Sequence, residues 1–450
     1  MTSLLSHGPR ARWLLVFALT ATVYLLTARW YGVVINDSSA AAWPAWNLVH
    51  HGTVRLDGVA VPHNTWFFTI HGHLVSNRFP GVVLIGVPAQ LLVLPFGAGP
   101  EVGSTITAAL VTAGAMANLA VLLGRLGASG RRATTCALVF AFGTSVWPVA
   151  SAELLTHGPD LLWLSLFALA VSAGRWWLAG IAMAPALLTR PHLVLVVAVV
   201  GVWLTVSRRA LRPVVCLGLV SAAGLGLLVA WNDWLYGAPS IRGGYPDALA
   251  RAQDFSSGAV SGNLLTQIAG SFVSPLRGVL LYVPLALLAL ACLPAGWRRS
   301  PDWARALMVG GVVYGIVQLR LNNFVGGYGY YGNRYWLEPL LCLAPVAFVG
   351  YDRWWAPQGA AYVRVARILA ALSCSIQAIG AVLAFSHPIH LYDADPWTHY
   401  LPLDVLEDTG LVGVLVAAFA LVWSLTFALR SPSEQPGDPT RAEPALVGTL

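Results

Sequence analysis

The sequence predicts an all-α polytopic membrane protein, a bundle of about 12 transmembrane helices with a long first external loop that contains interfacial helices. Two observations lead to this fold class. Of the 450 residues, 57% are hydrophobic and only 10% are charged, and the mean hydropathy is +0.69. A soluble protein usually has about 25% charged residues. The composition therefore excludes a cytosolic enzyme, a disordered protein and a secreted disulfide scaffold.

The individual helices follow from the apolar stretches. A helix needs about 20 apolar residues to cross the hydrocarbon core of a bilayer. The predicted spans are residues 13–34, 103–123, 133–150, 159–174, 176–190, 191–206, 213–231, 276–294, 306–321, 336–351, 366–386 and 410–429. Residues 80–97 are also apolar, but Pro80, Pro88 and Pro95 interrupt them. We therefore expect 80–97 to lie on or dip into the outer leaflet rather than to span it.

The arginines predict the orientation of the chain. All 26 Lys+Arg residues are arginine. If 80–97 does not span the membrane, 17 arginines lie inside, whereas 14 of the 19 acidic residues and 10 of the 11 histidines lie outside. The positive-inside rule then places both termini in the cytoplasm and the working face outside. The excess of arginine thus serves as an orientation signal and gives no reason to expect a nucleic-acid partner.

Three regions follow from this topology. Residues 1–350 form the expected transmembrane core, which begins with a signal-like but uncleaved span and includes the first external loop at about 35–102. Residues 351–430 add C-terminal transmembrane helices around an external loop at about 387–409. Residues 431–450, rich in Pro, Glu and Ser, are expected to form a disordered cytoplasmic tail. The five cysteines each lie in an apolar stretch without a CxxC pair, which argues against a disulfide framework or a zinc site.

Two polar residues stand out in the first external loop. Asp37 follows the first span, and a helix over 38–51 would place it near a helix N-terminus at the membrane surface. There it is either an exposed capping residue or a general base that meets both a lipid-borne and an aqueous substrate. Arg78 precedes the apolar segment 80–97, at the depth of lipid headgroups. Its guanidinium can clamp a phosphate or serve as a snorkelling anchor.

A second group of candidates lies between two later spans. If residues 151–160 are helical, Glu153, His157 and Asp160 fall at positions i, i+4 and i+7 on one face. Three titratable groups between apolar spans are costly unless they are paired or used in catalysis. A metal site is the less favoured use of these residue types. Arg190 interrupts an apolar stretch, where it can contact a phosphate or pair with an outer carboxylate.

Aromatic and amide side chains mark two further outer segments, at about 232–275 and 326–339. Aromatic rings beside Arg and Asn can stack on and hydrogen-bond to a sugar, although an aromatic belt at the membrane interface would have a similar composition. In the second segment, Gly329 and Gly332 favour backbone turns over a belt helix. The candidates for sugar or acceptor contact are Asn232, Tyr245, Tyr331, Asn333, Tyr335 and Glu338.

The order of these motifs resembles the GT-C class of polytopic glycosyltransferases, near the protein O-mannosyltransferases and the lipid A aminoarabinose transferases. In that class a catalytic Asp follows the first span, as Asp37 does in the segment NDSS. A Lys-Pro-Pro element follows in the same loop, where this chain has Arg78, Phe79 and Pro80. The stretches NDWLYGAP, SPLRGVLLY and YGYYGNRYWLEPLL resemble bacterial members of unassigned specificity, so the resemblance covers about residues 10–350.

Other site residues are implied by the same resemblance. The class has a second polar or acidic group after the third span, for which Glu153, His157 and Asp160 are the candidates, and the match does not select one of them. Arg190, in the segment LLTRP, resembles a further phosphate contact. Arg334 completes the set of candidate donor-phosphate ligands.

The resemblance also implies an activity. It indicates a glycosyltransferase of the bacterial plasma membrane with a role in cell-wall biogenesis. The donor would be a polyprenyl-phosphate monosaccharide, a hexose or a pentose, and the acceptor a cell-envelope glycan, lipid or protein on the external face. Transfer would invert the anomeric centre in one displacement, with Asp37 as the base and the arginines on the leaving phosphate. The residues support no cofactor beyond the lipid-linked donor, and they do not support a divalent metal.

Other functions fit the same composition. A lipid-linked saccharide transporter or flippase would need charges along a route through the bilayer, and few charges lie in the spans away from their outer ends. A polysaccharide polymerase or ligase would use a longer lipid-linked glycan. A structural assembly protein would leave the outer concentration of Asp, His and Arg without a use. The sequence leaves the sugar, the acceptor, the metal requirement and the oligomeric state open.

Overall fold

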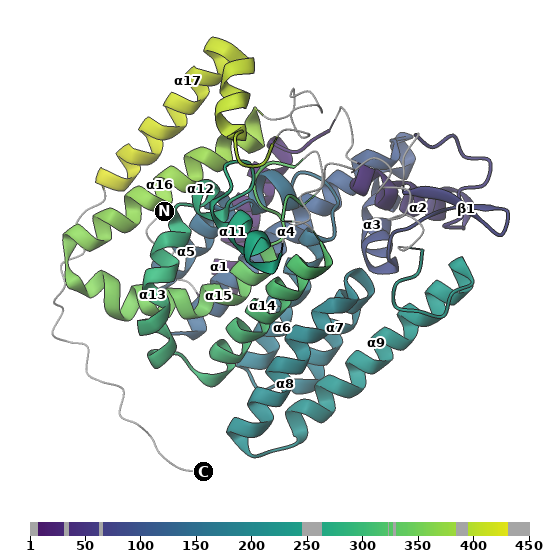
Figure 1. Cartoon of the computed structure of the whole chain (residues 1–450), viewed down its shortest axis with the longest axis horizontal. Helices are drawn as coiled ribbons and strands as arrows, with labels where there is room; N and C mark the ends of the chain where they lie inside the picture. The colour runs from purple at the N-terminus through teal and green to yellow at the C-terminus, as the bar shows by residue number, and fades with distance from the viewer. Residues whose placement is uncertain are drawn as a thin grey trace.

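The fold is a bundle of helices with a small β-hairpin at one edge (Figure 1). The computed structural model describes residues 8–30, 36–62, 66–244, 263–322, 324–326, 330–383 and 395–430. The helices that overlap the predicted spans are α1 (Pro9–Leu26), α4 (Pro100–Arg125), α5 (Gly130–Gly143), α6 (His157–Ser172), α7 (Trp176–Thr189), α8 (Val194–Arg208), α9 (Arg212–Tyr236), α13 (Leu285–Arg299), α14 (Asp302–Leu321), α15 (Leu337–Gly350), α16 (Ala360–Val382) and α17 (Leu401–Arg430). Short helices also occur at α11 (Leu264–Val273) and α12 (Val279–Tyr282).

Within the described ranges, six helical segments are long and apolar enough to cross a membrane. They are Pro100–Arg125, Pro191–Arg208, Arg212–Tyr236, Asp302–Leu321, Ala360–Val382 and Leu401–Val422. These segments support a membrane protein. The expected number of about 12 crossings, their orientation and the tail at 431–450 stay predictions, since that tail lies outside the described residues.

Three helix boundaries differ from the prediction. The span expected at 276–294 becomes a regular helix only at Leu285, because Pro284 disfavours the helical conformation in the residue before it, and Val283 has φ −131° and ψ 69°. The span expected at 133–150 breaks at Thr144, whose backbone is extended. Residues 401–409, expected in an external loop, are helical up to a kink at Gly410, with φ +57°. The remainder of that expected loop is described only from residue 395 onward.

The segment predicted as the first external loop contains both helical and extended structure. Helix α2 (Asn36–His51) confirms the helix expected at 38–51. It is followed by the antiparallel strands β1 (Phe67–Ile70) and β2 (His73–Ser76). The two-residue turn between them has φ +49° at His71 and +81° at Gly72, the positive values that match the twist of a hairpin. The expectation of an all-α protein is therefore wrong at this hairpin, because strands of four residues leave little pattern in a sequence.

The apolar segment at 80–97 forms helix α3 (Pro80–Val93) and a short 3₁₀ turn, η2 (Leu94–Phe96). Proline at its first position begins the helix, since the missing N–H is not needed there. Helix α3 packs against α2, α4 and α7. At about 1.5 Å per residue its 14 residues extend about 21 Å, less than the roughly 30 Å of a bilayer core. This length agrees with an interfacial or re-entrant element.

Helix α4 is the centre of the bundle. It contacts α1, α2, α3, α5 and α6, and 78% of its most apolar stretch of 18 residues is buried. Its buried face is rich in Ala, Gly, Ser and Thr, which let neighbouring helices approach closely. This close packing holds the ends of α2, α6 and α15 in one region, where the polar side chains gather.

We expect Gly81→Ala to destabilise the protein by about 1–3 kcal/mol, because overpacking forces neighbouring backbone to move. A Cβ at Gly81 would lie 2.4 Å from the Thr189 Oγ1 atom and 2.6 Å from the Thr189 backbone nitrogen. The matched control is Gly226→Ala, since a Cβ there meets nothing within 4 Å. The measurement is the midpoint of thermal unfolding in detergent, followed by labelling of the buried cysteines. Equal midpoints for both variants would contradict the close packing of α3 on α7.

Candidate functional site

Asp37 lies at the centre of a polar cluster formed by three distant segments. Its Oδ1 atom is 2.5 Å from Nη2 of Arg78, and its Oδ2 atom is 2.7 Å from Nη1 of Arg334. The hydroxyl of Tyr330 donates to the same Oδ2 at 2.5 Å. The exposed fractions of the Asp37, Arg78 and Arg334 side chains are 13%, 11% and 13%. One carboxylate is thus held between two guanidinium groups in a mostly buried position.

The segment that contains Arg78 is fixed on both sides. Arg78 follows β2, and its guanidinium stacks 5.0 Å from the Trp66 ring centroid. The Tyr236 hydroxyl, from the end of α9, donates to the Ser76 carbonyl at 2.7 Å. The Ser76 hydroxyl in turn donates to the Ala40 carbonyl in α2 at 2.5 Å. These bonds set the register between Arg78 and the first turn of α2, where Asp37 lies.

The segment that contains Arg334 and Tyr330 is fixed by a buried arginine. Arg277, only 1% exposed, donates to the carbonyls of Val325 and Tyr330. The Arg334 guanidinium lies 3.8 Å from the centroid of the Tyr330 ring, which stacks against it. Gly332 confirms the turn expected there, because its φ is +74°. Arg277 therefore acts on Asp37 indirectly, by holding the loop that supplies Tyr330 and Arg334.

The electrostatics of this cluster favour an anion. Burial alone would raise the pKa of Asp37, but Arg78, Arg334 and the Tyr330 hydrogen bond hold it well below its ordinary value. Two guanidinium charges face one carboxylate charge. The Nε atoms of Arg78 and Arg334 are buried and have no hydrogen-bond partner among the described residues. A phosphate or another anion beside Asp37 would supply both the missing charge and the missing acceptors.

Glu153 supports Asp37 from the side. Its Oε1 atom is 2.5 Å from Nη1 of Arg29, and its Oε2 atom accepts from the Ser38 hydroxyl at 2.5 Å. Ser38 directly follows Asp37 in α2. With both oxygens engaged, Glu153 positions the start of α2 against the end of α1.

The expected helical face of Glu153, His157 and Asp160 is wrong. Helix α6 begins at His157, and Glu153 lies in the turn before it. Pro159 lies in the first turn of α6, where its missing N–H is not needed, so it favours a helix that begins at this point. Glu153 therefore contacts the Asp37 side of the molecule, whereas His157 and Asp160 contact a separate buried network.

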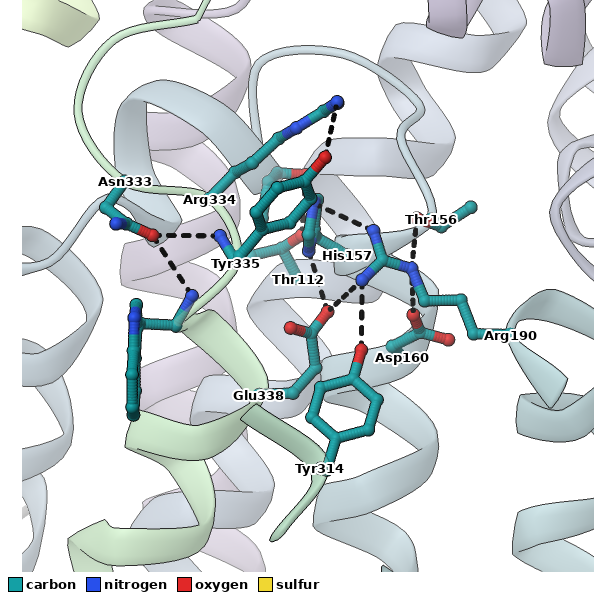
Figure 2. A network of polar contacts seen from close by, with 12 residues as sticks. Thr112, Thr156, His157, Asp160, Arg190, Tyr314, Asn333, Arg334, Tyr335 and Glu338 are labelled. Atoms are coloured by element: carbon teal, nitrogen blue, oxygen red, sulfur yellow. Dashed lines mark hydrogen bonds and ion pairs between the residues drawn. The ribbon is translucent and has the colours of Figure 1, made fainter. Parts of the chain in front are cut away.

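Figure 2 shows this buried network, which joins α6, α7, α14 and α15. Arg190 lies in its middle, with its Nε 2.8 Å from the Thr156 hydroxyl and 3.3 Å from Oδ2 of Asp160. Its Nη1 donates to the Tyr314 hydroxyl at 3.0 Å and lies 3.7 Å from Oε1 of Glu338. The side chains of Asp160 and Glu338 have no exposed surface. Arg190 thus pairs with carboxylates, the alternative to phosphate contact that the sequence left open.

The geometry fixes the tautomer of His157. Its Nε2 lies 3.0 Å from Nη2 of Arg190, and its Nδ1 lies 2.7 Å from Oε1 of Glu338. An arginine can only donate, so Nε2 of His157 is the acceptor and carries no proton. The proton is then on Nδ1, which donates to the Glu338 carboxylate. His157 is neutral in this arrangement.

Tyr335 lies between the two clusters. Its hydroxyl accepts from Nη2 of Arg334 at 3.4 Å, and its ring centroid is 6.4 Å from that of His157 (Figure 2). Asn333 fixes this turn, because its Oδ1 accepts from the backbone nitrogens of Tyr335 and Trp336 at 3.0 and 3.2 Å. Asn333 was expected to contact a sugar, and in the structure its side-chain amide oxygen shapes this turn. Glu338 begins the first turn of α15, so one short segment supplies both clusters.

The other sugar-contact candidates lie elsewhere. Asn232 is buried in α9 and donates to the Ser240 carbonyl at 2.7 Å. Tyr331 is 1% exposed, and its hydroxyl donates to the Ile376 carbonyl in α16 at 2.7 Å. The Tyr331 ring packs edge-on against Tyr282 in the core, a contact that contributes to the packing of the fold. Tyr245 lies outside the described residues.

Sequence reasoning missed Tyr330, Arg29, Ser38, Tyr314 and Arg277. Each of these residues contacts a partner that is distant in the sequence, so no local pattern indicated the contact. Among the described residues, no group of three or more His, Cys, Asp or Glu side chains could hold a metal ion.

No family model and no curated protein matches the chain. The chain is similar to solved structures of an oligosaccharyltransferase from Archaeoglobus fulgidus. The apo form matches with a TM-score of 0.48 and 16% identity, over 91% of this chain and 59% of that chain. The complex with an inhibitory peptide and a dolichol-phosphate matches with a TM-score of 0.49 and 14% identity, over 91% of this chain and 59% of that chain. The complex with Zn and sulfate matches with a TM-score of 0.49 and 15% identity, over 90% of this chain and 57% of that chain. This chain therefore spans less than two thirds of those proteins, and such identities transfer no residue roles.

The buried network predicts a strong coupling between Arg190 and Asp160. We expect Arg190→Met to destabilise the protein by about 3–5 kcal/mol, because two carboxylates lose their shared cation. Arg190→Met with Asp160→Asn should recover part of this loss, since one uncompensated charge is removed with it. Thermal unfolding of the single and double variants in detergent measures the effect.

Arg320→Met is the matched control, because Arg320 is exposed at the end of α14 and a surface change usually costs less than about 0.5 kcal/mol. Strictly additive effects of Arg190→Met and Asp160→Asn would contradict the pairing.

Proposed function

We propose that this protein is a membrane-embedded glycosyltransferase that moves a monosaccharide from a polyprenyl-phosphate donor to a cell-envelope acceptor on the external face. The proposal rests on the resemblance to the GT-C class and on one observation. The residues matched to the catalytic Asp and to the phosphate contact of that class, Asp37 and Arg78, are in direct contact at 2.5 Å. Arg334, 297 residues away from Asp37 in the chain, joins them at 2.7 Å.

The arginines provide the donor site in this proposal. A polyprenyl-phosphate sugar carries one phosphodiester charge at the membrane surface, and Arg78 and Arg334 present two guanidinium groups to it. The charge on the leaving phosphate grows as its bond to the sugar breaks. Preorganised cations in a water-poor site stabilise that charge, at roughly 3–4 kcal/mol for one well-placed group.

Asp37 is the base, but its two ion pairs make it a weak one before the donor binds. The donor phosphate competes for the same guanidinium groups. When it takes Arg78 and Arg334, the Asp37 carboxylate loses the charges that lower its pKa, and burial then raises that pKa. Donor binding therefore activates the base that the next step needs.

The chemical step is a single displacement. Asp37 removes the proton of the acceptor hydroxyl, and the acceptor oxygen attacks the anomeric carbon. The bond from that carbon to the phosphate oxygen breaks, with inversion, and its electron pair leaves on polyprenyl phosphate. The Tyr330 hydroxyl, which donates to Asp37 at 2.5 Å, orients the carboxylate during this transfer. The identity of the sugar is set by contacts beyond these charged groups.

We expect Asp37→Asn to reduce transfer by about 10²–10⁴-fold, the usual contribution of a general base. Wild-type protein and variants in proteoliposomes would be offered labelled polyprenyl-phosphate hexoses and pentoses, with membrane glycan extract as acceptor. Arg78→Gln and Arg334→Gln should lose transfer as well. Arg55→Gln is the matched control, because Arg55 lies on the same external loop but contacts His73 and Trp234 instead of Asp37.

The same assay separates the alternatives. Labelled lipid that crosses the bilayer without transfer would favour a flippase. Transfer only from donors with longer glycans would favour a polymerase or ligase. Full transfer by Asp37→Asn would exclude Asp37 as the base.

If the donor phosphate replaces the Asp37 carboxylate at Arg78 and Arg334, the pH profiles of kcat/KM and of kcat should differ on their acid sides. A carboxylate base works only when ionised, so activity falls as pH falls through its pKa. The acid limb of kcat/KM reports the free enzyme, in which the pKa of Asp37 is lowered, and that of kcat reports the donor complex. We therefore expect the acid limb of kcat to lie at higher pH than that of kcat/KM. Coincident limbs, or the opposite order, would contradict the exchange.

A further inference from the structure

Asn77, the residue directly before Arg78, has a buried amide group that the fold leaves unsatisfied. The residue is only 2% exposed, yet neither its Oδ1 nor its Nδ2 atom has a hydrogen-bond partner among the described residues. The Nε atom of the adjacent Arg78 is likewise buried without a partner. Burying an amide without hydrogen bonds costs free energy, so such a group usually contacts a water molecule or a ligand.

The backbone around Asn77 is held in place. Its N–H donates to the Trp66 carbonyl at 3.0 Å. The Ser76 hydroxyl accepts from the backbone nitrogen of Arg78 at 3.2 Å and donates to the Ala40 carbonyl in α2 at 2.5 Å. This hydroxyl therefore closes a short turn at Asn77 and fixes it to α2. The unsatisfied amide thus belongs to a well-fixed segment of the chain.

A second buried asparagine in the same predicted loop shows what a structural role looks like. Asn47, in α2, is 1% exposed, and its Nδ2 atom donates to the carbonyls of Thr53 and Arg55 at 3.0 and 2.6 Å. Those bonds hold the turn that follows the helix. The side chain of Asn77 makes no such bond among the described residues, so the fold itself does not use its amide.

The position of Asn77 indicates the kind of ligand. Arg78 contacts Asp37 at 2.5 Å, and consecutive Cα atoms are about 3.8 Å apart, so Asn77 lies beside the proposed phosphate site. In the proposed donor, one oxygen atom joins the sugar to that phosphate. An amide offers one acceptor and two donor hydrogens, which match neighbouring hydroxyl groups of a sugar. The guanidinium groups are the better partners for the phosphate charge.

We propose that Asn77 is a specificity-determining residue that hydrogen-bonds hydroxyl groups of the donor sugar. The proposal rests on the proposed transferase function, to which it adds the residue that contacts the sugar. A bound sugar satisfies the amide, whereas polyprenyl phosphate without a sugar leaves it unsatisfied. A buried polar group of this kind discriminates against a ligand that lacks the matching hydroxyl groups. Asn77 therefore favours the loaded donor over the lipid product of the reaction.

The test compares binding of two ligand types to the full-length protein in nanodiscs. The ligands are polyprenyl-phosphate hexoses and pentoses, and polyprenyl phosphate without a sugar. Asn77→Leu should weaken binding of the preferred sugar donor by roughly tenfold, the loss of about two net hydrogen bonds, and leave binding of polyprenyl phosphate unchanged. Asn77→Ala should have the same effect and serves as the second variant. Asn47→Leu is the matched control and should retain the wild-type discrimination.

Thermal unfolding without ligand separates a binding role from a structural one. Asn77→Leu should not lower the unfolding midpoint, because it removes an unsatisfied amide, whereas Asn47→Leu should lower it. A midpoint lowered in Asn77→Leu as much as in Asn47→Leu would overturn the proposal. Unchanged discrimination in both Asn77 variants would also overturn it, would leave the proposed function standing, and would reduce the site to a buried water. No binding of any sugar donor by wild type would overturn the proposed function and this assignment together.

Discussion

The ion pairs of Asp37 with Arg78 and Arg334 are the interaction on which the arrangement of the candidate site depends. They join α2, the segment after β2 and the loop before α15, three parts of the chain that share no local structure. Charges in a mostly buried position must be paired, because an isolated buried charge costs several kcal/mol. The pairing therefore fixes these segments to one another. It also places a carboxylate beside two cations, the arrangement on which the proposed transfer from a phosphate-linked donor rests.

The buried network around Arg190 follows the same rule at greater depth. One arginine, two carboxyl groups and a neutral histidine lie within ion-pair or hydrogen-bond distance of one another in a buried position, although both Asp160 oxygens and Oε2 of Glu338 have no hydrogen-bond partner among the described residues. Glu338 and Arg334 lie in the same short segment, so this network also anchors the loop that completes the site. His157 and Asp160, two of the residues expected to act in catalysis, thus belong to the network beside the loop that contacts Asp37, and their catalytic role stays a prediction. The support and the reactive cluster meet at Tyr335.

Much of this architecture could be predicted from the sequence, and the failures have definite causes. Apolar runs located the helices, and Asp37 and Arg78 were predicted as site residues because they lie at the membrane surface, within reach of a lipid-borne substrate. The pairing of Asp37 with Arg334 spans 297 residues, and no local pattern encodes such a contact. The helical face expected for Glu153 and His157 ignored Pro159, which favours a helix that begins at this point. Tyr330 was missed because its neighbours in a tyrosine-rich run look equivalent until the turn at Gly332 is known.

The most direct measurement is the binding of polyprenyl phosphate to wild type and to Asp37→Asn in detergent or nanodiscs. If the phosphate displaces the Asp37 carboxylate from Arg78 and Arg334, removing that competing charge should tighten binding by about tenfold or more, equivalent to roughly 1.4 kcal/mol. Glu153→Gln is the matched control, because Glu153 contacts Arg29 and Ser38 and should not compete. Equal or weaker binding to Asp37→Asn would show that the phosphate does not occupy the arginine pair, and the proposed donor site would be wrong.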